Sequence, residues 1–192
     1  MRRLSLVLLL PSLAVPGQGR AQQPERDSGR FVVLQGGVIV GQEEFSIERV
    51  EGGLNVIVTG SYPPAVPNRV IASFGPRRIT VRLATDGTEM AREYPGGARS
   101  LVVADRALSL YALAGGMTPG PVTVHGLGSR DRESATLEDR GRGPLPGPDS
   151  TMARRMTLRT GGGQVELWYD DAGRLLRIAV PAKDLTAERA GR

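Results

Sequence analysis

The stretch VELWYDDAGRLLRIAV, residues 165–180, decides the fold of this chain. It contains two runs of aliphatic and aromatic residues on either side of the sequence DDAG at 170–173. Asp and Gly tolerate the backbone conformations that tight reversals need, and Pro181 ends the second run because proline has no N–H to donate to a neighbouring strand. The stretch therefore predicts a β-hairpin.

Alternation of apolar and polar residues indicates further strands before this hairpin. Ile79, Val81 and Leu83 alternate with polar residues, and the same pattern recurs over 54–59 and 44–48. Successive strand residues point to opposite faces, so alternation indicates one apolar and one solvated face. This pattern is typical of antiparallel sheets, because parallel strands covered on both faces read as continuous apolar runs. We expect a mainly β domain with a curved antiparallel sheet or incomplete β-barrel.

Turns and loops separate the apolar runs. Tight reversals are expected where glycine interrupts them, at 36–37, 51–53, 86–87 and 161–163. Two proline-rich stretches, 62–68 and 141–149, are expected to be irregular loops at the rim of the sheet, because proline cannot donate in a β-ladder.

One short helix is expected among the strands. The segment 105–114 begins with a capping residue, Asp105, and places Leu108 and Tyr111 on one face at helical spacing. The C-terminal residues 184–190 are expected to form at most a short turn. A single helix of this kind can cover one open side of a curved sheet.

The first 21 residues have the pattern of a secretory signal peptide. The positive start MRR is followed by an apolar run over 4–15 and by the small-x-small pattern GRA at 19–21. The apolar run is shorter than the roughly 20 residues that span a bilayer. We expect cleavage of residues 1–21, a mature chain without a transmembrane segment, and a periplasmic or extracellular location. A retained N-terminal anchor helix is the alternative.

The rest of the chain is expected to be a polar, disordered leader over 22–30 and a single antiparallel β-domain over 31–190. The 192 residues include 25 Lys and Arg and 20 Asp and Glu, for a net charge of +5. Residues 1–21 hold three of the basic residues and none of the acidic ones, so the mature chain carries +2. Nucleic-acid binding requires a basic stripe with interleaved aromatic residues, so no nucleic-acid partner is expected.

Few side chains could support catalysis or metal binding. The chain has no Cys and one His, which excludes thiol chemistry, disulfides and multi-histidine metal sites. His125 could in principle join Ser129 and Asp131 in a triad, but no Gly-x-Ser-x-Gly elbow exists, and a structural role is expected. Glu43 and Glu44 point to opposite faces of a strand, so they cannot act as a pair and are expected to be solvated. We expect no catalytic residue, metal or cofactor.

The apolar face of the sheet is the candidate binding surface. Only one short helix is available to cover it, and an open curved sheet leaves a pocket suited to an apolar guest. A fully packed core is the alternative. The candidate ligand-binding residues are Val56, Val58, Ile79, Val81, Leu83, Met156, Leu158, Leu167 and Ile178.

Two motifs carry a family resemblance. The sequence LWYDDAGRLLRI at 167–178, with Val180 and Pro181, and the sequence GVIVGQEEFSI at 37–47 resemble an uncharacterised family of secreted bacterial β-domains. That family is similar to the periplasmic lipoprotein-carrier half-barrel group. The resemblance covers residues 31–190, with specific matches at the two ends. It implies a curved antiparallel sheet around a helix, a place in the cell envelope and binding of a lipid, and it carries over no catalytic residue.

Three functions therefore stand as expectations. The first is a non-enzymatic periplasmic or secreted domain that holds a lipid or other apolar ligand on the concave face of its sheet. The alternative is a structural or protein-interaction domain of the envelope with a packed core. The third is a hydrolase that uses His125.

Overall fold

The computed structural model describes residues 25–62, 66–104, 106–127, 132–147 and 151–191. Within these ranges the chain forms thirteen strands and two short 3-10 helices. The strands are β1 (Arg26–Gln35), β2 (Val38–Val50), β3 (Gly53–Tyr62), β4 (Val66–Phe74), β5 (Arg78–Thr85), β6 (Thr88–Pro95), β7 (Ser100–Val103), β8 (Gly120–Gly126), β9 (Arg132–Pro144), β10 (Met152–Thr160), β11 (Gly163–Tyr169), β12 (Leu175–Val180) and β13 (Leu185–Arg189). The helices are η1 (Leu108–Gly116) and η2 (Pro181–Lys183).

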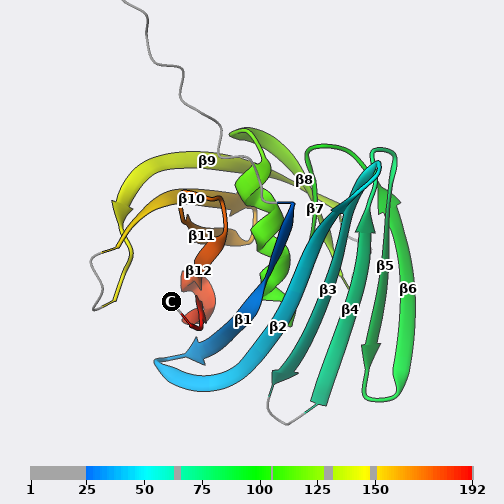
Figure 1. Cartoon of the computed structure of the whole chain (residues 1–192), viewed down its shortest axis with the longest axis horizontal. Helices are drawn as coiled ribbons and strands as arrows, with labels where there is room; N and C mark the ends of the chain where they lie inside the picture. The colour runs from blue at the N-terminus through cyan, green and yellow to red at the C-terminus, as the bar shows by residue number, and fades with distance from the viewer. Residues whose placement is uncertain (1–24, 63–65, 105, 128–131, 148–150, 192) are drawn as a thin grey trace, which may run out of the picture.

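All thirteen strands belong to one sheet, in the order β6-β5-β4-β3-β2-β1-β13-β12-β11-β10-β9-β8-β7. Every neighbouring pair is antiparallel except β7 and β8, which are parallel. The sheet curls around η1, which runs through its concave side (Figure 1). The predicted fold class, a curved antiparallel sheet or incomplete barrel with one short helix, is confirmed.

The sequence pattern accounts for most of these strands. Ile79 and Val81 are buried while Arg82 is exposed, as the alternation requires. The hairpin over 165–180 forms as β11 and β12, with Leu167 opposite Ile178. Glycine-containing turns join β1 to β2, β2 to β3, β5 to β6 and β10 to β11, and Asp86 adopts a positive φ of 48° in one of them. The predicted reversals are therefore confirmed.

The proline-rich stretch 62–68 is more regular than expected. β4 begins at Val66, and Tyr62 lies opposite Val66 in the β3–β4 ladder. Pairing between β4 and β5 starts only at Asn68, so the N–H that Pro67 lacks is not needed by that ladder. The predicted loop is therefore wrong for Tyr62 and for residues 66–68, which belong to β3 and β4. Residues 63–65 lie outside the described residues.

The stretch 141–149 also continues a strand. β9 runs to Pro144, opposite Met152 of β10, and Gly141 with φ +74° lies where the register shifts. Beyond the strand, the buried Leu145 packs on the outer face of the sheet with Ala153, Trp168 and Leu176. The prediction of an irregular loop is therefore wrong for residues 141–144, because this part of β9 stays paired with β10.

Both ends of the described chain are more ordered than the sequence pattern indicates. β1 begins at Arg26, so the disordered leader predicted over 22–30 has to be corrected for residues 26–30. The buried Asp27 accepts hydrogen bonds from Nη2 and Nη1 of Arg189 at 2.6 and 3.2 Å. Residues 185–189 form β13 instead of a turn, and this strand joins β1 to β12. The cleaved segment predicted over 1–21 lies outside the described residues.

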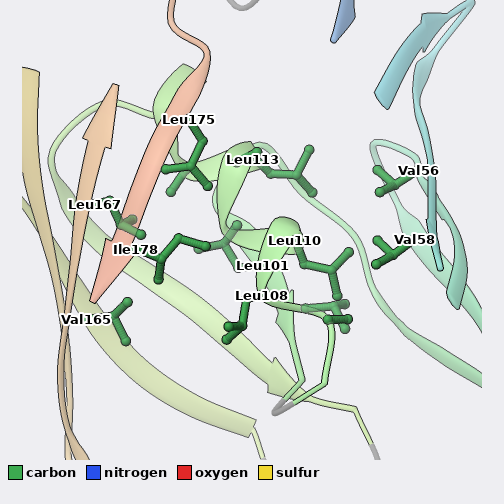
Figure 2. Packing of buried hydrophobic residues seen from close by; sticks show 14 of the residues in the cluster. Val56, Val58, Leu101, Leu108, Leu110, Leu113, Val165, Leu167, Leu175 and Ile178 are labelled. Atoms are coloured by element: carbon green, nitrogen blue, oxygen red, sulfur yellow. The ribbon is translucent and has the colours of Figure 1, made fainter. Parts of the chain in front are cut away.

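The core lies between η1 and the concave face of the sheet. Every residue from Leu108 to Gly115 except Tyr111 is buried, and the sequence LSLYALAGG offers a largely apolar surface on all sides. Figure 2 shows the helix, with Leu108, Leu110 and Leu113 labelled, between two walls of the barrel. One wall carries Val56 and Val58, and the other carries Val165, Leu167, Leu175 and Ile178.

Gly115 sets how closely the helix approaches β11. A Cβ atom at this position would lie 2.6 Å from Cε1 of Tyr169, whose ring is buried and whose hydroxyl donates to the Tyr111 carbonyl at 2.9 Å. We expect Gly115→Ala to lower the free energy of unfolding by about 1–3 kcal/mol, because neither group can move aside. Urea unfolding measures this. Gly143→Ala, where a Cβ would meet nothing within 4 Å, is the matched control. Equal losses in the two variants would contradict this account of the packing.

Candidate functional site

The two edges of the sheet, β6 and β7, do not pair with each other. Between the inner face of the barrel near this seam and the segment that enters η1 lies an open pocket of about 220 Å³. We call it the seam pocket. Its described lining consists of Asn68, Val70, Leu83, Thr85, Ala104, Arg106 and Leu127.

Strand register builds one wall of the seam pocket. Asn68 lies opposite Thr85 and Val70 lies opposite Leu83, on the paired strands β4 and β5. These four side chains occupy alternate positions, so they face the same side of the sheet. Val70 and Leu83 are apolar, and Asn68 and Thr85 are polar, so this wall has an apolar part and a polar part.

The second wall comes from the segments that follow β7 and β8. Ala104 and Leu127 are half-buried, and the Leu127 N–H donates to the Val103 carbonyl at 2.8 Å, which holds the two segments together. Arg106 stands at this side with an exposed side chain. The seam pocket therefore combines four apolar residues with an amide, a hydroxyl and one guanidinium.

A buried carboxylate fixes the chain next to the seam pocket. Glu43 has no exposed surface, and its two carboxylate oxygens accept hydrogen bonds from the backbone N–H groups of Leu108 at 2.7 Å and Ser109 at 2.8 Å. The Tyr62 hydroxyl donates a third hydrogen bond to it. The amide of Asn68 donates to the Arg106 carbonyl at 2.8 Å. Strands β2, β3 and β4 together clamp the segment from Arg106 to Ser109, and we call these contacts the inlet clamp.

The burial of Glu43 overturns the expectation that both glutamates are solvated. Glu44 is exposed, but Glu43 shares the inner face with Phe45 and Ile47. The first N–H groups of a helix have no partner within the helix and carry a partial positive charge. Glu43 supplies both missing acceptors, and its charge is stabilised by three donors instead of by water.

Tyr62 is held as a hydrogen-bond donor by its surroundings. Burial raises the pKa of its phenol well above the ordinary value of 10, and the neighbouring charge of Glu43 raises it further, while Arg106 acts in the opposite direction. The ring needs space beside Gly60, where a Cβ would lie 2.9 Å from Cε2 of Tyr62 and 2.6 Å from Oδ1 of Asn68. A glycine at this strand position therefore lets the inlet clamp assemble.

The other end of η1 meets a cation. Nη1 of Arg154 lies 3.5 Å from the carbonyl oxygen of Gly115, and its guanidinium also binds Asp139 at 2.9 and 3.0 Å. An acid at the first turn and a base at the last turn both match the helix dipole. The helix is thus held at each end by the barrel wall.

The nine predicted ligand-binding residues divide into two groups. Leu83 is half-buried and lines the seam pocket. The other eight belong to the packed core around η1: Val56, Val58, Ile79, Val81, Met156, Leu158, Leu167 and Ile178. The role of all nine residues in ligand binding stays a prediction.

Sequence reasoning missed every described lining residue of the pocket except Leu83, and it also missed the burial of Glu43. A signal for two of them exists, because Asn68 is followed by inward-facing Val70, and Glu43 by inward-facing Phe45. A polar residue in phase with an apolar face indicates either a buried hydrogen-bond network or a site. Arg106 and Leu127 follow the ends of strands and carry no such periodic signal.

His125 lies at the seam, apart from the lining of the pocket. It is buried, its ring centroid is 4.9 Å from that of Tyr94, and the Tyr94 hydroxyl donates to the Gly126 carbonyl at 3.1 Å. These contacts tie β6 to β8 across the seam. The proposed triad partners Ser129 and Asp131 lie outside the described residues, so the hydrolase alternative is untested.

The inlet clamp makes a stability prediction. Glu43→Gln turns one acceptor into a donor that faces backbone N–H groups, so we expect the free energy of unfolding to fall by about 2–4 kcal/mol. Amide exchange at Leu108 and Ser109 should accelerate in the same variant. Glu44→Gln, one residue away on the exposed face, should change stability by at most about 0.5 kcal/mol. Similar losses in both variants would rule out the clamp.

His125 makes stability depend on pH. Burial lowers the pKa of the imidazole below its ordinary value of 6.5, and the charge of Arg132 lowers it further, against a smaller opposing effect of a hydrogen bond to the Pro95 backbone. The unfolded chain therefore binds a proton first as pH falls, so this contribution to stability is complete above about pH 6.5 and is lost as pH falls through the folded pKa.

We expect the unfolding free energy of the wild type to drop more between pH 7.5 and pH 5 than that of His125→Phe. The chain has one histidine, so its imidazole NMR signals report the folded pKa directly. A folded pKa at or above 6.5 would contradict the assignment.

Comparisons with protein-family models, with curated proteins and with solved structures give no match to this chain. The resemblance to secreted bacterial β-domains therefore stays a prediction. Within the described ranges, no helix is long and apolar enough to cross a membrane. The same part of the chain contains no group of three or more His, Cys, Asp or Glu side chains placed to hold a metal ion.

Proposed function

We propose that this chain is a non-enzymatic domain of the cell envelope or the secreted fraction that binds a lipid or another apolar molecule in the seam pocket. The observation that carries the proposal is the pocket itself, an opening of about 220 Å³ with Val70, Leu83, Ala104 and Leu127 in its lining. Concave sites with mostly apolar walls and a few polar groups are the usual form of small-molecule sites.

Packing favours the seam pocket over the rest of the concave face. The other eight candidate residues are buried in one hydrophobic cluster with the residues of η1, so a ligand that touched them would have to open this packed cluster. Full burial of one aliphatic side chain contributes about 1.5–3 kcal/mol, and η1 buries Leu108, Leu110 and Leu113. A ligand would have to replace all of that burial, whereas Leu83 is accessible without it.

The size of the pocket limits how much of a ligand can enter. Sites that enclose a drug-sized ligand have volumes of roughly 300–1,000 Å³, and the seam pocket is smaller. It suits one acyl chain or one ring, with the remainder of the molecule in solvent. Export through the segment 1–21 would place the protein where free lipids and other apolar envelope components occur.

The second candidate function is a structural or protein-interaction domain of the envelope, and exposed apolar residues favour it. Ile57 and Ile71 are cross-strand neighbours on the outer face of β3 and β4, with 41% and 37% of their surface exposed. Val38 and Ile39, at the start of β2, are each 67% exposed. Cross-linking through these positions that captures one discrete protein, with no apolar ligand bound, would favour this function.

Filling the pocket tests the first function. Leu83→Trp adds bulk to the pocket wall, so we expect the affinity for the neutral probe dodecanol to fall at least tenfold, which corresponds to about 1.4 kcal/mol. Ile71→Trp places the same side chain on the outer face of the neighbouring strand and should leave the affinity within twofold.

Titration calorimetry below the aggregation limit of the probe gives both affinities, and urea unfolding checks that both variants are folded. Native mass spectrometry of protein purified from its own envelope supplies the physiological ligand. An equal effect of the two substitutions, or a wild type that binds no apolar probe, would overturn the proposal.

A further inference from the structure

We infer that the ligand of the seam pocket is a single-chain amphiphile with a carboxylate head group, and that Arg106 binds the carboxylate. This inference rests on the proposed function and specifies the chemistry of its ligand.

Arg106 is the only ionisable residue in the described lining of the pocket. Its side chain is exposed, and no carboxylate among the described residues forms an ion pair with it. Glu43, the acid of the inlet clamp, is fully buried and already accepts three hydrogen bonds. The guanidinium is thus available to an anion that arrives from solvent.

The backbone that carries this guanidinium is fixed before any ligand binds. Asn68 holds the Arg106 carbonyl, Glu43 holds the next turn, and the N–H of Ala107 donates to the Ala104 carbonyl at 3.3 Å. Binding therefore orders only the Arg106 side chain, and little of the binding free energy is spent on the loop. The backbone from Arg106 to Ser109 is thus held by hydrogen bonds that do not depend on a ligand.

The geometry of the guanidinium favours a planar anion. Its N–H groups form a fork that matches the two oxygens of a carboxylate in a bidentate pair, which is stronger than a neutral hydrogen bond. Thr85, on the opposite wall, is a further residue with a polar group in the lining. A cationic head group would meet repulsion from Arg106, and a neutral head group would leave the guanidinium solvated but unpaired.

The apolar residues fix the other half of the ligand. Val70, Leu83, Ala104 and Leu127 form a surface for one hydrocarbon chain beside Arg106. At about 220 Å³ the pocket lacks the space for two chains side by side. The chemistry that satisfies both halves is a chain of methylenes that ends in a carboxylate, as in a free fatty acid.

A four-probe calorimetric titration of the whole protein tests this inference. The probes share a twelve-carbon chain and differ only at the head: dodecanoate, dodecanol, dodecyl phosphate and dodecyltrimethylammonium. At pH 8 we expect dodecanoate to bind at least tenfold more tightly than dodecanol and the cation to bind most weakly. The preference for dodecanoate over dodecanol should shrink as salt is added, because Arg106 is exposed to solvent.

Two variants locate the preference. In Arg106→Gln the ratio of the dodecanoate affinity to the dodecanol affinity should fall from at least tenfold to within twofold. Arg69→Gln removes the same charge from an exposed position beside Asn68 and should keep the preference. Arg106→Lys should retain part of it, since the charge remains and the fork is lost.

The outcomes separate this inference from the proposed function. Equal affinities for dodecanoate and dodecanol, an undiminished preference in Arg106→Gln, or tenfold tighter binding of dodecyl phosphate than of dodecanoate would each overturn the carboxylate assignment, yet leave an apolar site in place. Failure of all four probes to bind would overturn the proposed function as well.

Discussion

The contact on which the rest of the structure depends is the pair of hydrogen bonds from the first turn of η1 to Glu43. A helix that enters the interior of a sheet brings free N–H groups into a place that water does not reach. Without an acceptor there, the helix would have to stay outside and the concave face would be uncovered. One carboxylate on β2 removes that cost and allows LSLYALAGG to serve as the core of the barrel.

The helix inside the barrel and the two unpaired edges of the sheet together shape the seam pocket. Strands β2, β3, β7 and β12 pack against η1. The edge strands β6 and β7 are the place where the sheet does not close, and β7 has only four residues. The contacts of Tyr94 with His125 and Gly126 hold the seam together, while the pocket remains beside Arg106.

The sequence predicts well what depends on neighbouring residues. Alternation and turn residues give the strands, the hairpin over 165–180 and the antiparallel class, because these follow from local backbone preference and burial of one face. Contacts between distant residues escape such reasoning. Asp27 and Arg189 are 162 positions apart, and their ion pair joins the first and last strands of the described chain, β1 and β13.

In the candidate site, too, features set by neighbouring residues were predictable and contacts between distant residues were not. Leu83 was predictable because it is in phase with Ile79 and Val81 on one strand. Glu43 was expected to be solvated because the Leu108 N–H that donates to its carboxylate lies 65 residues away in the sequence. No local pattern shows that the helix η1 passes through the barrel beside Glu43. Arg106 belongs to the site only because Asn68 and Glu43 hold the segment around it. The position of Arg106 in the pocket lining therefore depends on tertiary contacts, which its sequence neighbours do not reveal.

The inlet clamp also links the seam pocket to the core. Asn68 lines the pocket and also donates a hydrogen bond to the Arg106 carbonyl. Glu43 accepts hydrogen bonds from Leu108 and Ser109, the first two residues of η1. A contact that moved Arg106 would strain hydrogen bonds that are buried, and buried bonds are costly to break. The pocket is for this reason expected to accept a ligand that fits its present shape, and to reject one that requires the entrance of the helix to move.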